Sequence, residues 1–453
     1  MISFQQLAGS INGEIVMPGD AGYDALRRVW NHDIDLKPAA IVLCKSADDV
    51  ASTIQFAHKN DFPVAVRSGG HSFAGHGVCD NGIVVNLSNM RRLQIDVPAR
   101  LVTIEPGVRA GELDQVAQAF GLAVPLGSCP TVGVAGFALS GGNGSLTTKF
   151  GFACDSLVRA RVISADADII TADQDHNPDL FWALRGGGGN FGIVTSLEFR
   201  LHHVENVLSG HLTYPISRIK EILHFLDEYV QSIPDELYII ATVMPRPGER
   251  MIDIAVVWSG NPEEGEMILS PLRSFAQPTE DSIRAKRYLE EQQSGSDSPG
   301  HGDWASYRRA GHLPRLTAEV LDVIGDFARG GPTENCGVSM IYWHGRWCAR
   351  DYDNAFGFRR VGYEYWVHSY WQDPNKREKS YRWVDDFHAL LQAHASSAVY
   401  VNDLGRESAE RVRNAYGSKY ERLAQIKAKY DPDNFFHINQ NIEPEGSTRS
   451  ASL

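Results

Sequence analysis

Three clusters of glycine stand out in the first half of the chain, which holds 42 glycines among its 453 residues. Loops of this kind expose backbone N–H groups without side chains, and converging N–H groups bind anions, most often phosphates. Tight turns would explain one cluster, but three so close together favour a cradle for a phosphate-bearing ligand. The clusters are Ser68-Gly69-Gly70-His71, Gly133-Val134-Ala135-Gly136 running on to Gly141-Gly142-Asn143-Gly144, and Arg185 to Gly192.

The glycines do not fit the common nucleotide-binding motifs. Gly187 to Gly192 formally matches G-x-G-x-x-G, but that motif needs a strand before the glycines and a helix after them. Here a helix is predicted over 179–184 and a strand over 193–201, so no helix N-terminus can hold a pyrophosphate. The P-loop pattern G-x-x-x-x-G-K-[ST] does not occur. His71 and His76 lie on a glycine loop with a spacing that is poor for a metal pair, so we expect no metal site.

The surrounding pattern predicts an α+β fold with two bodies, one rich in glycine before about residue 206 and one rich in aromatic residues after it. Short apolar runs predict the strands of the first body, and longer amphipathic stretches predict the helices of the second. In the first body we predict strands at 39–43, 63–66, 83–87, 101–104, 158–164, 169–171 and 193–201, with helices after Ser46 and at 111–120 and 179–184. In the second we predict strands at 238–243, 252–258, 337–343 and 361–370, with helices at 219–233, 316–328, 381–394 and 416–429.

Composition argues against several classes of partner. Acidic residues outnumber basic ones by 56 to 43, and no basic run is present, so we expect no nucleic-acid binding. No apolar stretch approaches the ~20 residues that span a bilayer, so we expect no membrane insertion. The six cysteines are scattered without a C-x-x-C pair, which favours free thiols in a reducing compartment. The N-terminus lacks the features of a secretory signal, so we expect a cytoplasmic protein.

Five segments of the chain carry a recognisable order and spacing of residues. They are Val66 to Ser72, Gly127 to Gly133, Arg185 to Thr195, Tyr430 to Phe436 and Gln440 to Pro444. Together they resemble the FAD-linked oxidases, and more narrowly the berberine-bridge-enzyme-like group of the vanillyl-alcohol-oxidase superfamily, over nearly the whole chain. The resemblance implies a two-part FAD-binding domain of the PCMH type, over 1–206 (core about 35–206) and 399–453. Between these parts, it implies an α+β substrate-binding domain with an antiparallel sheet over 207–398.

The resemblance also implies that FAD is attached covalently. In this family the histidine of the R-S-G-G-H loop is bonded to the flavin 8α carbon, and that position is His71. Some members add a bond from a cysteine to flavin C6, and Cys129 stands at that position; the alternative is a small buried residue beside a proline. The other residues expected to bind FAD are Arg67, Ser68, Gly69, Gly70, Ser72, Thr131, Val132, Gly133, Gly136, Gly141, Gly142, Asn143, Gly144, Val194, Asn439 and Asn441.

A flavin oxidase also needs a group that takes a proton while hydride passes to the flavin. The family carries Tyr-x-Asn-Tyr before its last helices, and here the segment reads Tyr400-Val401-Asn402-Asp403. Tyr400 is the first candidate for the base, and Asp403 is a candidate to contact a basic substrate. The family's strand over the flavin makes Tyr342 and His344 the second candidates, because alternate residues from Met340 to His344 point to the same side; the alternative for each is an ordinary strand residue.

The resulting hypothesis is an oxidase that acts on a small hydroxylated or cyclic substrate, such as a sugar, alcohol, alkaloid or polyketide. Molecular oxygen would reoxidise the flavin and give hydrogen peroxide. Two alternatives stay open: an oxidative cyclase or dehydrogenase on the same scaffold that uses oxygen poorly, and a flavin-binding protein without catalytic activity.

Overall fold

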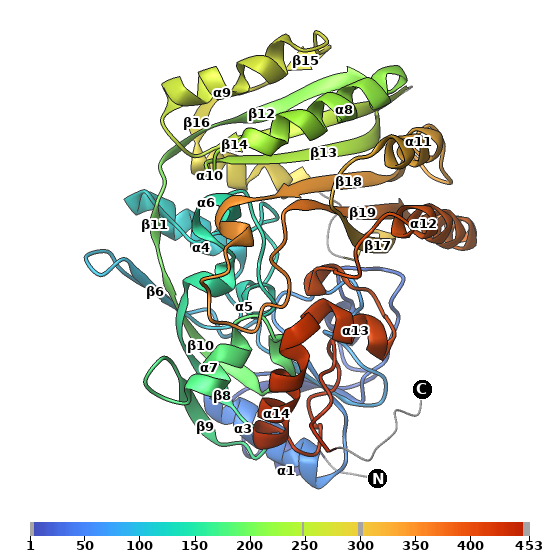
Figure 1. Cartoon of the computed structure of the whole chain (residues 1–453). Coiled ribbons are helices and arrows are strands. Elements are labelled where there is room, and N and C mark those ends of the chain that lie inside the picture. Colours follow the sequence, from blue (N-terminus) through green and yellow to red (C-terminus); the bar gives the residue numbers. More distant parts are fainter. Residues whose placement is uncertain (1–3, 247–248, 298–301, 447–453) are drawn as a thin grey trace.

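A computed structural model describes residues 4–246, 249–297 and 302–446, and it contains three main sheets (Figure 1). The first sheet has the order β1-β2-β4-β3, in which β2, β3 and β4 are parallel and β1 is antiparallel. All four residues of β4 are buried, as expected for a covered parallel strand. The strands are β1 (Glu14–Val16), β2 (Ala40–Leu43), β3 (Val64–Arg67) and β4 (Ile83–Asn86), with helices α1 (Gln5–Ala8), α2 (Tyr23–Arg27) and α3 (Ala47–Lys59).

Helix α3 begins where the sequence predicts, because the Ser46 side chain accepts a hydrogen bond from the Asp49 N–H and caps the first turn.

The second sheet is antiparallel and has the order β5-β6-β10-β8-β9, and its β8–β9 hairpin matches the predicted one. Its strands are β5 (Leu93–Asp96), β6 (Leu101–Ile104), β8 (Leu157–Ile163), β9 (Ile169–Ala172) and β10 (Ile193–Arg200). Beside it lie α4 (Ala110–Ala117), α5 (Val134–Leu139), α6 (Thr147–Phe150) and α7 (Pro178–Leu184), and the short pair β7 (Leu122–Ala123) and β11 (His202–His203).

The third sheet is antiparallel, has eight strands and forms the core of the second body. Its order is β15-β12-β14-β13-β18-β19-β17, and β16 also pairs with β12. The strands are β12 (Asn206–Pro215), β13 (Leu237–Arg246), β14 (Glu249–Trp258), β15 (Glu280–Asp281), β16 (Arg284–Arg287), β17 (Ala305–Leu313), β18 (Asn335–Trp343) and β19 (Gly362–Trp371). The helices of this region are α8 (Ile219–Tyr229), α9 (Pro262–Ser274), α10 (Tyr288–Gln292), α11 (Ala318–Phe327) and α12 (Arg377–Gln392).

The two faces of this sheet have different neighbours. Helices α8, α11 and α12 cover one face, where Leu226, Ile324 and Phe387 form a core with strand residues such as Val243 and Met340. We call this the helix-covered face (Figure 1). Because side chains alternate along each strand, every second residue points to the opposite side, toward the first body. We call that side the cavity face. The mixture of helices with antiparallel sheets confirms the predicted α+β class.

The C-terminal segment returns to the first body through α13 (Ala409–Tyr416) and α14 (Tyr420–Tyr430), drawn in red in Figure 1. Its anchor is a fully buried ion pair between Lys427 and Asp431, 2.5 Å long. The Lys427 ammonium also donates to the carbonyls of Asn190 (2.7 Å) and Phe436 (3.0 Å), so the charge has the partners that burial requires. This network fixes residues 430–436 against the third glycine cluster.

Several elements of the structure were not predicted from the sequence, among them the long strands β12 and β17 and the helices α9 and α13. Strand β17 was not predicted, because Arg308 and Arg309 interrupt its apolar pattern. Helix α9 contains Pro271, which reads as a helix breaker. Among the described residues, no helix is long and apolar enough to cross a membrane.

Candidate active site

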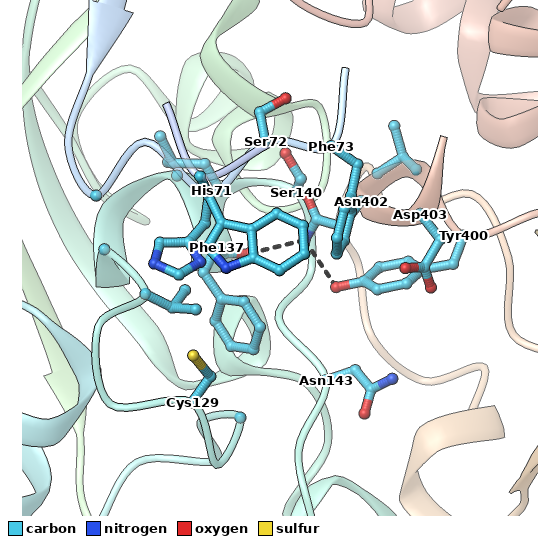
Figure 2. A pocket seen from close by; sticks show the side chains of 18 of the residues that line it. His71, Ser72, Phe73, Cys129, Phe137, Ser140, Asn143, Tyr400, Asn402 and Asp403 are labelled. Atoms are coloured by element: carbon cyan, nitrogen blue, oxygen red, sulfur yellow. Dashed lines mark hydrogen bonds between the residues drawn. The ribbon is translucent and has the colours of Figure 1, made fainter. Parts of the chain in front are cut away.

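The candidate site is a cavity of about 1170 Å³ between the glycine loops of the first body and the cavity face of the eight-stranded sheet. All three predicted glycine clusters contribute to its wall, together with the segment 400–404 and part of 436–440. Figure 2 shows His71, Cys129 and Tyr400 arranged around this cavity. Of the residues predicted to bind FAD, the cavity is lined by Arg67, Ser68, Gly69, Gly70, His71, Ser72, Cys129, Val132, Gly133, Gly136, Asn143, Gly144, Val194 and Asn439.

The loop after β3 has the backbone that an anionic cofactor needs. The N–H groups of Gly69 and Gly70 make no hydrogen bond within the described residues, and Gly70 adopts a φ of 71°, which favours glycine. A Cβ atom on Gly69 would lie 2.2 Å from the Gly133 nitrogen, so the first two clusters pack backbone against backbone. A Cβ atom on Gly136 would meet nothing within 4 Å, which leaves this side of α5 open. These features fit a phosphate-bearing cofactor such as FAD.

The two predicted attachment residues face the cavity from neighbouring loops. His71 Nε2 lies 3.0 Å from Thr131 Oγ1, and that oxygen lies 3.5 Å from Cys129 Sγ. Thr131 does not line the cavity itself but lies between the two residues that do. The indole of Trp30 stacks on the His71 ring at 6.1 Å between centroids. The Thr131 hydroxyl and the Trp30 indole are therefore among the groups that hold the imidazole.

Tyr400 is almost fully buried, with 4% of its surface exposed, and its hydroxyl lies at the cavity wall. The phenolic oxygen accepts hydrogen bonds from the Gly142 N–H (2.7 Å) and from Asn402 Nδ2 (2.8 Å; Figure 2). Burial raises the pKa of Tyr400 well above its usual value, and the two donors oppose that shift. The direction of this pKa shift favours the protonated phenol of Tyr400 at neutral pH.

Gly141 and Gly142 were predicted to bind the cofactor, but in the structure they do not line the cavity. A Cβ atom on Gly141 would lie 2.8 Å from the Phe356 ring and 3.0 Å from the Tyr400 ring. Both glycines have positive φ, which turns the Gly142 N–H toward Tyr400. A side chain at Gly141 would therefore displace the Tyr400 ring, whereas a side chain at Gly142 would meet Ala153 and Phe137.

Asp403 lines the cavity beside Tyr400, and its carboxylate forms an ion pair with the Arg308 guanidinium of β17. The guanidinium carbon lies 3.5 Å from the centre of the Phe73 ring, so the cation is held by a carboxylate and an aromatic face. Figure 2 shows Asp403 and Phe73 at the same end of the cavity.

His368 of β19 also lines the wall, and burial lowers its pKa to about 3, so it is neutral.

Tyr342 and His344 lie away from the cavity, which corrects the prediction that they face the flavin. Tyr342 packs in the core of the helix-covered face, against Tyr363, and His344 donates a 2.8 Å hydrogen bond to the Leu237 carbonyl. Side chains alternate between the two faces of β18 as predicted, but the residues that face the cavity are Ser339 and Ile341 rather than Tyr342 and His344. All residues of β18 from 336 to 343 are buried, so polarity could not indicate which face covers the site.

The end of the chain supports the third glycine cluster. Asn190 donates to the Gly187 and Gln440 carbonyls and accepts from the Ile442 N–H. Asn439 reaches the cavity, whereas Asn441 does not line it. Arg308 and His368 were not predicted from the sequence, because isolated side chains on strands carry no motif. Among the described residues, no three His, Cys, Asp or Glu side chains gather as a metal site would require.

Comparisons with known proteins agree with this geometry. Residues 38–173 match the FAD binding domain family, and residues 399–443 match the berberine and berberine-like family. The (R)-6-hydroxynicotine oxidase of Paenarthrobacter nicotinovorans is 31% identical over 97% of this chain and 98% of its own length. The crystal structure of 6-hydroxy-D-nicotine oxidase from Arthrobacter nicotinovorans superposes with a TM-score of 0.90, at 30% identity, over 96% of this chain and 99% of that one.

A more distant structure shares the fold. Glucooligosaccharide oxidase from Acremonium strictum, which carries a 6-S-cysteinyl, 8α-N1-histidyl FAD, has a TM-score of 0.88 at 23% identity, over 97% of this chain and 99% of that one. The nicotine oxidase alignment runs through both parts of the first body and the sheet between them. The family matches fall on the cavity loops and on the returning C-terminal segment. From this agreement of sequence, fold and cavity we conclude that the chain belongs to the berberine-bridge-enzyme-like FAD-linked oxidoreductases of the vanillyl-alcohol-oxidase superfamily.

Proposed function

We propose that this chain is an oxidase with bicovalently attached FAD, bonded through His71 and Cys129. The observation that carries the proposal is the arrangement of these two side chains on one cavity wall, linked through the Thr131 hydroxyl. The relative with a cysteinyl and histidyl FAD supports it by analogy. Residues 1–206 and 399–453 would form the FAD domain, and residues 207–398 the substrate domain. When bound, FAD would supply a hydride acceptor at N5 and a route for the electrons to oxygen, with hydrogen peroxide as the product.

The proposed substrate is a small hydroxylated or cyclic molecule that lies against the cavity face of the sheet. Thr242 of β13 and Ser339 of β18 line this face and are joined by a 3.2 Å hydrogen bond between their hydroxyls. Trp366 of β19 adds an aromatic surface. Hydroxyl groups and an indole are typical of sites that bind ring substrates with several polar groups.

Asp403 is the proposed proton acceptor. The Arg308 cation stabilises its carboxylate, whereas burial keeps the neighbouring Tyr400 protonated. Tyr400 would donate its hydrogen to a substrate oxygen, and Asp403 would take the proton that leaves the substrate. These roles reverse the order of candidates that the sequence suggested, because the sequence did not reveal the cation beside Asp403.

A peroxide-coupled screen over sugars, alcohols, alkaloids and other cyclic compounds tests the proposed function. We expect at least one class to bleach the flavin under anaerobic conditions and to release peroxide in air. Bleaching without peroxide, and turnover only with an artificial acceptor, would favour a dehydrogenase or cyclase instead. Failure of every compound to reduce the flavin would favour a binding protein.

A further inference from the structure

A second carboxyl group, from Glu364 of β19, lies behind Asp403. Glu364 is 1% exposed, and neither of its carboxyl oxygens has a hydrogen bond of standard geometry within the described residues. It stands on the cavity face of the sheet, directly across from Ile341 of β18 and from His312 of β17. An ionised carboxylate buried without partners is costly, so its protonation state needs a physical explanation.

Four polar groups surround the Glu364 side chain. Burial raises its pKa most, the Asp403 carboxylate raises it further, and Arg308 and the Trp343 indole oppose the shift. The fourth group, His312, adds no charge, because burial lowers its pKa to about 4. The single cation of the cluster, Arg308, forms its ion pair with Asp403. Two neighbouring carboxyl groups that share one cation cannot both ionise cheaply, and the one without the cation retains the proton.

We propose that Glu364 is a positioning residue, which keeps its proton at neutral pH, donates it in a hydrogen bond to Asp403 and so holds Asp403 as an oriented carboxylate at the cavity wall. The role of Asp403 toward substrate rests on the proposed function, whereas the protonation of Glu364 does not. With one cation, one anion and one neutral acid, the cluster formed by Arg308, Asp403 and Glu364 has no net charge. Such a wall suits an uncharged hydroxyl group better than a cationic amine.

Infrared spectroscopy of the holoenzyme at about pH 8 tests the protonation directly. The wild type should show the C=O band of a protonated carboxyl group, and Glu364→Gln should lose it. Asp114 is the other buried carboxyl that needs a control, since burial raises its pKa to about 7. The band must therefore persist in Asp114→Asn. A wild type without the band, or a band that survives in Glu364→Gln, would overturn the proposal.

Thermal unfolding gives a second test that needs no turnover. The unfolded chain loses the proton of a glutamic acid above about pH 4.3, whereas an acid with a raised pKa in the folded state still binds it. The folding stability therefore falls as the pH rises. Glu364→Gln has the same shape, cannot ionise and still donates a hydrogen bond. The Tm of this variant relative to wild type should therefore increase from pH 5 to pH 8. A difference that stays constant or decreases would mean that Glu364 is ionised in the fold.

Kinetics then test the positioning role. Glu364→Gln should keep kcat/KM within about threefold, because its amide still donates to Asp403. Glu364→Leu removes the donor, so kcat/KM should fall about tenfold and the acid limb of its pH profile should move to higher pH. Equal profiles for wild type and Glu364→Leu would contradict positioning. If no substrate is found, the spectroscopic and unfolding tests still decide the protonation state, which separates this inference from the proposed function.

Discussion

The backbone N–H of Gly142 donates a 2.7 Å hydrogen bond to the phenolic oxygen of Tyr400, which lies 258 residues further along the chain. This bond joins the second glycine cluster to the C-terminal segment at the edge of the cavity. Gly141 and Gly142 both have positive φ, which glycine adopts readily. This backbone conformation directs the Gly142 N–H toward the Tyr400 oxygen.

Tyr400→Phe should lower both stability and activity. The change leaves the Gly142 N–H and the Asn402 amide without their acceptor in a buried site, which costs about 1–3 kcal/mol of unfolding free energy. We expect a lower Tm and a fall in kcat/KM of about tenfold or more. Tyr342→Phe is the matched control, since Tyr342 lies on the helix-covered face, and it should leave kcat/KM unchanged. Equal effects of the two substitutions would contradict this assignment.

Thr131→Val should impair attachment of the flavin to His71, because the hydroxyl that contacts His71 Nε2 is lost. The test is cleanest in a Cys129→Ala background, where His71 would be the one remaining link. The fraction of flavin that stays with the denatured polypeptide should fall clearly below that of the Cys129→Ala parent. Thr131→Ser keeps the hydroxyl and should match the parent. Full retention in the valine variant would show that the contact is dispensable.

Asp403→Asn should reduce kcat by roughly a hundredfold or more, because a neutral amide cannot accept the substrate proton. The binding of substrate, read from KM, should change less. Asp385→Asn provides a control at an ion pair away from the cavity, where Asp385 contacts Arg309. That variant should keep its kcat. A small effect of Asp403→Asn on kcat would leave Tyr400 as the better candidate for the base.

Asp114 should make stability depend on pH between about 4 and about 7. Burial raises the pKa of this carboxyl to about 7, above its value of about 3.9 in the unfolded chain. The folded state therefore retains a proton that the unfolded state has lost, and stability falls by up to about 1.4 kcal/mol for each pH unit in that window. The Tm of Asp114→Asn relative to wild type should rise across the window and level off above it.

The glycine clusters were predictable because each reports a local constraint. Gly70 and Gly188 have positive φ, and Gly69 packs against the Gly133 backbone, so the residue type itself marks the turn or the close approach. The reversed order around Gly187 also holds, with α7 before the glycines and β10 after them. Gly141 and Gly142 also have positive φ, but they do not line the cavity, and the Gly142 N–H points to Tyr400.

The polar wall of the cavity could not be predicted from the sequence. Arg308, Glu364 and His368 meet only because β17 and β19 pair in one register, and that pairing is set by contacts far apart in the chain. Strand β18 is buried on both faces, so its alternation does not tell which residues face the site. Tyr342 and His344 were assigned to the wrong face for that reason.

The most direct test of the central claim is whether flavin stays with the polypeptide after denaturation in acid or SDS. The wild type should retain its yellow colour, and so should His71→Ala and Cys129→Ala, because each keeps one bond. The double variant His71→Ala/Cys129→Ala should release all of its flavin. Release from the wild type would contradict both links, and release from either single variant would contradict the remaining one.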